Sequence, residues 1–413
     1  MRDIKDMEKT IKIRMQSKIV KFLDLAIEYL IYGLIFFLPI SIAGISSFAG
    51  VAVVLFLVKQ ILSPDFSAIK SNKMFFLIFL VFFIFMGLSL LNSGPLLEKS
   101  FKALLLKWGK FPLIIWALLD TFRDTRRIVK AVWVFFFSAA LVGLTTFSQK
   151  FFDLEFLRGR AFSGIVTGPF KHKNDLASYL TCIIPVVLSL GLWKWKQIFL
   201  KVVFFLIATM LMVVSFWTFS RGGWVGLMAG FISVAFLTNY SRLGKKTFWL
   251  LFLIGNIFFI SVMSFVLMSF QNRGASGRFS LYRGAWKMII EHPFLGKGLG
   301  TFMDYCPQYT NNFGVYYAHN CFLQIWAESG IFSLLSFVLL VGYVLYKSMR
   351  VTFRIPISVD FFILIGLNSG LLAFLVHSFF DTHFYSFQLS FLFWVLLGLN
   401  ISLYSTRDKV PYL

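Results

Sequence analysis

Long runs of apolar residues, separated by short polar segments, dominate this 413-residue chain. Each run approaches the roughly 20 residues that a helix needs to cross the hydrocarbon core of a bilayer. Because a backbone in hydrocarbon must satisfy its own hydrogen bonds, these Phe-, Leu-, Ile- and Val-rich runs predict helices. We therefore predict an all-α, polytopic membrane protein with about twelve transmembrane helices. The expected spans are 22–42, 45–62, 74–91, 101–119, 128–147, 174–192, 197–218, 222–239, 247–268, 319–346, 357–379 and 384–405.

The amino-acid composition also indicates a membrane protein. Hydrophobic residues make up 58% of the chain, 54 residues are Phe, and the mean hydropathy is +0.80. Soluble globular proteins contain about 45–50% apolar residues. The composition therefore excludes a soluble globular protein.

Basic side chains in the short polar segments predict the orientation. By the positive-inside rule, the side that collects Lys and Arg is the cytoplasmic one, and alternate segments do collect them. An even number of spans then places both termini in the cytoplasm. The formal net charge of +22 thus reflects membrane orientation, and we expect membrane lipids and no nucleic acid as partners. The basic segments contain Lys18 and Lys21; Arg123, Arg126, Arg127 and Lys130; Lys194 and Lys196; Arg242, Lys245 and Lys246; and Lys347, Arg350 and Arg354.

Two segments on the opposite, external side are longer than the others, 148–173 and 269–318. No span-length repeat or low-complexity linker divides the chain. We predict a single transmembrane helical domain, 1–413, with 269–318 as an external loop. Residues 1–21 are basic and of mixed charge, and no small-residue cleavage site closes the apolar stretch after them. They are interpreted as a cytoplasmic arm rather than a cleaved signal.

The three cysteines, Cys182, Cys306 and Cys321, lack the spacing of metal ligands. Neither a metal site nor a disulfide framework is therefore indicated, and we expect no metal and no cofactor. A single Cys306–Cys321 bridge outside the membrane stays open as an alternative.

The segment Ser-Arg-Gly-Gly-Trp at 220–224 falls at the external end of an uncharged run. An arginine near hydrocarbon is costly unless it is paired or functional. The planar guanidinium of Arg221 suits bidentate contact with phosphate oxygens, and two glycines permit close approach of a backbone or ligand. The simpler interpretation is an interfacial arginine that extends to lipid headgroups.

The external loop contains a second arginine, Arg278, at the start of a helical pattern. Apolar residues recur after it at helical spacing, which predicts an amphipathic helix at or near the membrane interface. The helix should end at His292-Pro293, and a flexible or tightly turned connection with three glycines, Gly296, Gly298 and Gly300, should follow. The apolar positions are Leu281, Tyr282, Ala285, Trp286 and Ile289.

His319 opens the next span on the external side. A histidine there is suited to act as a general base near neutral pH, and the bland alternative is an interfacial polar cap. Lys107 is expected to face a cavity inside the protein. Polar groups also gather late in the chain. The candidates for substrate contacts besides the two arginines are Arg283, Asn320, Lys107, His172 and Asn174, and the late polar groups are His377, Asp381 and His383.

Together these segments resemble the O-antigen ligase and polymerase superfamily of bacterial membrane glycosyltransferases. The resemblance rests on Ser-Arg-Gly-Gly-Trp at 220–224, on Gly-Arg and His-Pro-Phe-Leu-Gly-Lys-Gly-Leu-Gly within 277–300, and on Ala-His-Asn-Cys-Phe-Leu-Gln through Glu-Ser-Gly at 318–330. A weaker match lies at 168–177, where Lys173 stands in place of the expected proline. The order of these motifs extends over most of the chain.

The resemblance implies metal-independent transfer of a glycan from an undecaprenyl-diphosphate carrier to an acceptor hydroxyl, such as that of lipid A-core. The reaction would occur on the periplasmic face of the bacterial inner membrane, in lipopolysaccharide biosynthesis. Arg221 and Arg278 would bind the diphosphate, and His319 would orient or deprotonate the acceptor hydroxyl. Attack opposite the leaving group predicts inversion at the anomeric carbon.

The resemblance leaves the acceptor open. Ligases that modify lipid A-core, polymerases that extend the lipid-linked glycan and ligases that glycosylate proteins share this pattern, and we favour the ligase because no further soluble domain is attached. A lipid or polysaccharide transporter would predict internal repeats and ionisable residues at mid-membrane, and a structural membrane protein would need no convergence of the arginines and histidine.

Overall fold

The computed structural model describes residues 2–193, 197–239, 275–310 and 317–408, and within these ranges the chain is helical without a β-strand. Nine of the described helices are long and apolar enough to cross a membrane. The predicted span 247–268 lies outside the described residues, as do Lys194, Lys196, Arg242, Lys245, Lys246 and parts of the loop 269–318. The nine helices are α2 (Ile42–Leu62), α4 (Lys73–Leu88, extended by η1, Ser89–Asn92), α7 (Thr125–Phe152), α8 (Lys173–Gly191), α9 (Ile198–Trp217), α10 (Arg221–Asn239), α14 (Cys321–Thr352), α15 (Val359–His377) and α16 (Phe387–Arg407).

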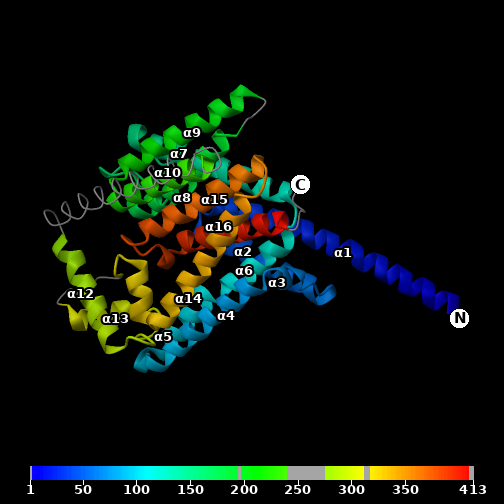
Figure 1. Ribbon diagram of the computed structural model, residues 1–413, viewed down its shortest axis with the longest axis horizontal. Coiled ribbons are helices and arrows are strands. Elements are labelled where there is room, and N and C mark those ends of the chain that lie inside the picture. Colours follow the sequence, from blue (N-terminus) through cyan, green and yellow to red (C-terminus); the bar gives the residue numbers. More distant parts are fainter. Residues whose placement is uncertain (1, 194–196, 240–274, 311–316, 409–413) are drawn as a thin grey trace.

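Two of the predicted spans differ in the structure. The predicted span 22–42 belongs to α1 (Arg2–Phe37), a helix of 36 residues that projects beyond the other helices (Figure 1). The predicted span 101–119 is not one continuous helix, because Pro112 has no N–H to continue the ladder to the Trp108 carbonyl. It is divided into α5 (Leu97–Lys102), the π-helical turn η3 (Ala103–Trp108) and α6 (Lys110–Thr121). Twelve uninterrupted spans are thus not confirmed.

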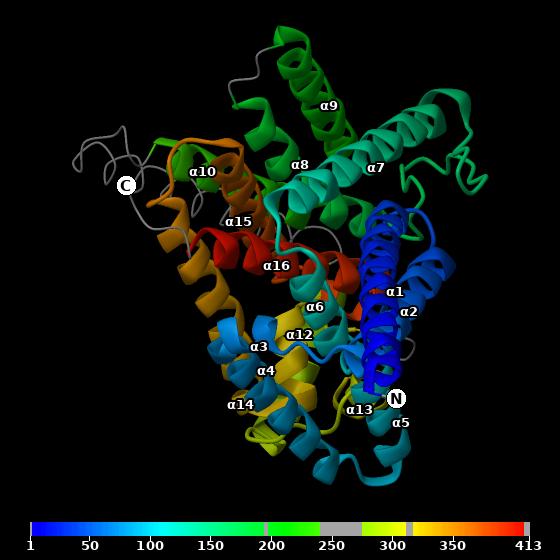
Figure 2. The same ribbon diagram turned by 90° about the vertical axis from the view of Figure 1, so that its right-hand side faces the viewer.

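The helix α16 runs through the middle of the bundle (Figure 2). In its most apolar stretch 94% of the residues are buried, and Asn400 on α16 donates a hydrogen bond to Asn368 on α15 at 3.1 Å. On one side, α15 packs against α8 and α10. A Cβ at Gly226 would lie 2.7 Å from the Ala373 carbonyl oxygen, so this glycine permits the close approach of α10 to α15.

Ion pairs tie several helices together at one end of the bundle. Lys59 on α2 lies 2.6 Å from both Asp24 on α1 and Asp120 on α6, and Arg127 on α7 lies 2.7 Å from Asp24. Arg407, at the end of α16, pairs with Asp360 at the start of α15. The basic segment 123–130 therefore lies at the same end as the part of α1 that carries Asp24. Residues 2–21 of the predicted arm belong to the helix α1 itself.

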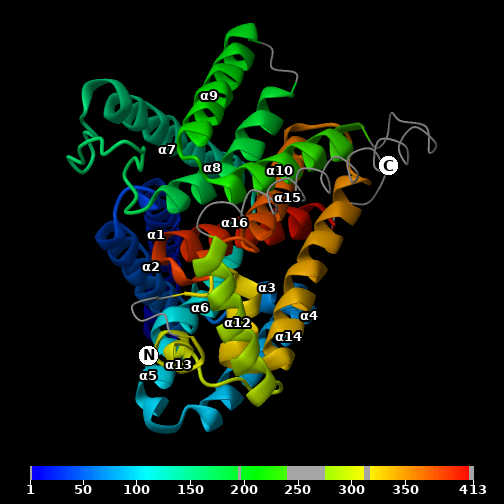
Figure 3. The ribbon, with the colours of Figure 1, turned by 90° about the vertical axis from the view of Figure 1, so that its left-hand side faces the viewer.

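The opposite end carries α12 (Ala275–Glu291), α13 (Phe302–Tyr309) and α5 (Figure 3). The predicted helix after Arg278 is confirmed, and it ends before His292. Its buried side chains pack on α13 and α14, whereas Trp286 is 49% exposed and meets Trp326 edge to face. The apolar stripe is thus shifted from the predicted one and contains Leu281, Ala285, Met288 and Ile289.

Candidate active site

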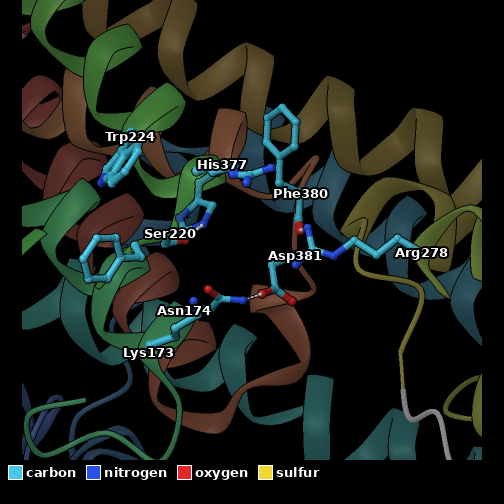
Figure 4. A pocket seen from close by; sticks show the side chains of 11 residues that line it. Lys173, Asn174, Ser220, Trp224, Arg278, His377, Phe380 and Asp381 are labelled. Carbon is cyan, nitrogen blue, oxygen red and sulfur yellow. Dashed lines mark hydrogen bonds between the residues drawn. The ribbon is translucent and has the colours of Figure 1, made fainter. Parts of the chain in front are cut away.

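A cavity of about 550 Å³ lies where the start of α8, the start of α10, the end of α15 and the first turn of α12 meet. Figure 4 shows side chains from all four segments directed around it. The predicted residues Arg221, Arg278 and Asn174 share this cavity. The remaining lining residues are Lys173, Phe219, Ser220, Gly222, Trp224, His377, Phe380 and Asp381.

Arg221 is placed by a sharp turn between α9 and α10. Phe219 has a left-handed φ of 50°, and the Ser220 hydroxyl accepts a hydrogen bond from the Gly223 N–H at 3.4 Å, as an N-cap residue does. A Cβ at Gly222 would lie only 2.6 Å from Phe380 Cβ. The glycine therefore permits tight packing of α10 against the end of α15, and Arg221 stands at the positive N-terminus of α10.

Arg278 reaches the same cavity from the first turn of α12. Its guanidinium donates a hydrogen bond to the Phe380 carbonyl at 3.4 Å. One turn later, the Tyr282 hydroxyl donates to the His319 carbonyl at 3.3 Å. The helix α12 is thus tied both to the segment after α15 and to the segment before α14.

His319 adjoins the cavity through Asp381. Its Nδ1 lies 3.0 Å from one Asp381 carboxylate oxygen, and Asn174 donates to the other oxygen at 2.6 Å. His319 has a left-handed φ of 51°, which places its side chain at the turn into α14. With Nδ1 donating to the carboxylate, Nε2 is the nitrogen that accepts a proton.

Asp381 is an anion in this setting. Burial acts to raise the pKa of its carboxyl, but the hydrogen bonds from His319 and from the Thr382 N–H hold that pKa well below its ordinary range. The Thr382 N–H donates to it at 2.8 Å. A carboxylate that stays ionised can orient a histidine and stabilise its protonated form.

Of two further histidines, His377 lines the cavity, and His383 packs against His377. The rings of His377 and His383 are 4.2 Å apart between centroids, both are buried, and His377 Nε2 is 3.5 Å from the Ser220 hydroxyl. Burial lowers the pKa of His383 to about 4, so its imidazole is neutral at neutral pH.

Several residues of the cavity had no assigned role from the sequence. Asp381, His377 and His383 stood out only as late polar groups, and Asp381 and His377 have partners more than 50 residues away in the chain, His319 and Ser220. Lys173, the departure from the family pattern, adds a cation to the cavity wall. The sequence signal for Asp381 was its position just after an apolar run.

Four predicted contact residues do not line the cavity. Asn320 instead caps α14, where its side-chain oxygen accepts from the Leu323 N–H at 3.0 Å. Arg283 lies over the Phe279 ring, 5.5 Å from its centroid. His172 is exposed just before α8, and Lys107 lines a different cavity, beside Gly300.

The glycine segment after α12 is tightly turned. Gly296, Gly298 and Gly300 all have positive φ, and the Gly298 N–H donates to the Glu328 carbonyl at 2.8 Å. The Glu328 carboxylate accepts from the Gly300 N–H at 2.9 Å. This buried carboxylate therefore fixes the segment against α14.

Cys306 and Cys321 are both buried and carry free thiols, so the bridge left open by the sequence does not form. In the part of the chain that the structure describes, no group of three or more His, Cys, Asp or Glu side chains is placed to hold a metal ion.

Comparison with known proteins agrees with the motifs. A family model described as O-antigen ligase matches residues 205–338, a range that contains Arg221, Arg278 and His319. The chain is also similar to an O-antigen ligase of Salmonella typhimurium strain LT2, with 24% identity over 337 residues that cover 75% of this chain and 80% of the relative. The resemblance predicted from the sequence is thereby confirmed, by the family model over residues 205–338 and by the relative over 75% of the chain.

Proposed function

We propose that this protein is an O-antigen ligase-like glycosyltransferase of lipopolysaccharide biosynthesis. It transfers a glycan from undecaprenyl diphosphate to a hydroxyl of an acceptor such as lipid A-core. One observation carries the proposal: Arg221 and Arg278, which are 57 positions apart in the sequence, line the same cavity. Asp381 lines it too, and His319 contacts Asp381.

The diphosphate of the donor is proposed to bind between Arg221 and Arg278. Positive charge on this cavity comes from two guanidiniums, the ammonium of Lys173 and the N-terminus of α10. Each of these groups can bind phosphate oxygens. This charge stabilises the diphosphate as it leaves. Because side chains supply it, we expect transfer to continue in EDTA.

His319 is proposed as the base. Its Nε2 takes the proton of the acceptor hydroxyl as that oxygen bonds to the anomeric carbon, and the bond from this carbon to the diphosphate oxygen breaks. Asp381 holds the imidazole at Nδ1 and stabilises its protonated form. Attack opposite the leaving diphosphate inverts the anomeric configuration.

We further propose that the cavity faces the periplasm and that both termini lie in the cytoplasm. The basic segments gather at the end with the Lys59 and Arg127 ion pairs, and the positive-inside rule assigns that end to the cytoplasm. The cavity lined by Arg221 and Arg278, called the arginine cavity below, lies at the other end of the bundle. On an inner membrane, that is the side where lipid-linked glycans meet lipid A-core.

Transfer by the purified full-length protein in lipid tests the proposal. Undecaprenyl-diphosphate-linked glycan would be supplied in EDTA, either with lipid A-core or alone. We expect glycosylated lipid A-core in the first reaction. Chain extension with donor alone would instead identify a polymerase, and movement of the lipid-linked glycan across the bilayer without transfer would identify a transporter.

A further inference from the structure

A second cavity, of about 510 Å³, lies at the same end of the bundle as the arginine cavity and shares no lining residue with it. It is formed by η2 (Gly94–Leu96), α5, η3 and the glycine segment. Three ammonium groups line it, those of Lys99, Lys102 and Lys107. A cavity with several lysines is suited to an anionic ligand.

We call this second cavity, lined by Lys99, Lys102 and Lys107, the lysine cleft. Its positive charge is only partly neutralised by ion pairs within the protein. Lys102 pairs with Glu98 in an exposed i,i+4 pair, and Lys99 pairs with Asp304 on α13. Lys107 makes no ion pair with any residue in the described ranges. Exposed pairs are weak, so an incoming phosphate can compete for Lys102. The Lys107 charge acts on the buried Glu328 carboxylate without forming an ion pair with it, so its ammonium can also take a phosphate oxygen.

A glycine brings the backbone close to these ammonium groups. Gly300 has a φ of 69°, and a Cβ at this position would lie 3.2 Å from Ala103 Cβ and 3.9 Å from Lys107 Nζ. The absence of a side chain keeps the cleft open beside Lys107. The same close approach anchors the glycine segment to η3.

Exposed apolar side chains on the helical segments that form the lysine cleft favour a lipid as the ligand. Leu106, which lines the cleft, is 69% exposed. A row of apolar groups beside a phosphate site matches an amphiphile, whose headgroup occupies the cleft while its acyl chains lie in the bilayer. A free phosphate would use only the lysines. Leu97, Phe101 and Leu105, on the same helical segments, are also exposed, although they do not line the cleft.

Hydrogen bonds connect the lysine cleft to the segment that carries His319. The Glu328 carboxylate accepts from the Gly300 N–H at 2.9 Å and from the Gln324 amide at 3.1 Å. The Gln324 oxygen in turn accepts from the Ala318 N–H at 3.0 Å. The same buried carboxylate thus fixes Gly300 in the wall of the cleft and, through Gln324, the residue before the proposed base.

We propose that the lysine cleft binds a phosphate group of the acceptor lipid, while the arginine cavity binds the diphosphate of the donor. This inference rests on the proposed function, and it names the acceptor class as a phosphorylated membrane lipid. Lys102 and Lys107 hold the phosphate, and the lipid chains lie along the exposed apolar side chains.

Acceptor kinetics of a paired set of variants test the inference. The cleft variant is Lys102→Gln with Lys107→Gln, and the control variant, Lys171→Gln with Lys287→Gln, removes the same charge from exposed positions on the same side. Each is assayed in lipid with lipid A-core and with enzymatically dephosphorylated lipid A-core. We expect the cleft variant to raise the KM for phosphorylated acceptor about tenfold, with the donor KM unchanged.

Dephosphorylated acceptor should show the same high KM with wild type, cleft variant and control. An unchanged KM in the cleft variant, or an equal rise with both acceptors or in the control, would overturn the inference. Binding of fluorescent lipid A-core to the same proteins separates this inference from the proposed glycan transfer. It measures acceptor binding in the lysine cleft even if the wild-type protein shows no transfer. Displacement of that probe by millimolar inorganic phosphate would show a phosphate site rather than a lipid site.

Discussion

His319 Nδ1 and a carboxylate oxygen of Asp381 lie 3.0 Å apart, although 62 positions separate the two residues in the chain. The loop after α15 carries Asp381, and the turn into α14 carries His319. This pair joins His319 to a carboxylate that lines the same cavity as Arg221 and Arg278, and it is the relationship on which the proposed chemistry depends.

Asp381→Asn should lower kcat for glycan transfer by about 100-fold, because the amide cannot stabilise a protonated imidazole. The KM for the donor should change little, since Asp381 does not supply positive charge. Steady-state transfer to lipid A-core measures both constants. Asp153→Asn is a matched control in the exposed loop after α7, and equal kcat values for the two variants would remove Asp381 from the mechanism.

Arg221→Lys and Arg278→Lys should each reduce kcat/KM by about 10- to 100-fold, because an ammonium cannot make the two parallel hydrogen bonds of a guanidinium. Charge is conserved, so the loss would report geometry rather than net charge. Arg158→Lys, at an exposed position of the 148–173 loop, should keep wild-type activity. Full activity of both cavity variants would show that the guanidinium geometry is not required.

Gly222→Ala should destabilise the protein and impair transfer. The added Cβ would lie 2.6 Å from Phe380 Cβ and 3.0 Å from His377 Cδ2, and such overpacking costs about 1–3 kcal/mol. Gly87→Ala on α4 is the control, because a Cβ there meets nothing within 4 Å. Thermal unfolding in detergent should show a lower Tm for the first variant only, and equal Tm values would contradict the packing argument.

Acidification should destabilise the fold partly through His383. Burial lowers the pKa of His383 from 6.5 to about 4, so between these values the unfolded chain binds a proton that the folded chain does not. Stability is therefore lost as the pH falls through this window. His383→Gln should show a shallower decline of Tm between pH 6.5 and about 4, and a slope equal to that of wild type would exclude this contribution.

The helices were predictable from the sequence where their signal is local. The spans at 45–62, 174–192 and 222–239 agree with α2, α8 and α10 to within a few residues, because apolar length alone decides them. The helix after Arg278 was likewise predictable from its spacing. The break at Gly109, three residues before Pro112, was missed because the surrounding residues remain largely apolar on both sides of it.

The site was predictable only in part. Arg221 and Arg278 were singled out by chemistry and by resemblance, and the fold brings them to one cavity. The partnership of His319 with Asp381 depends on how the ends of α14 and α15 meet, which no local pattern encodes. Lys107 was expected at a cavity and lines one, but that cavity is the lysine cleft rather than the cavity of the two arginines.

The most direct test of the central claim is transfer of undecaprenyl-diphosphate-linked glycan to lipid A-core by purified Arg221→Ala, Arg278→Ala and His319→Ala variants that retain the wild-type Tm. Each variant should lose transfer by about 100-fold or more. His319→Ala should still bind the donor with wild-type affinity, whereas the arginine variants should not. Transfer at the wild-type rate by all three folded variants would contradict the assignment of this cavity as the active site.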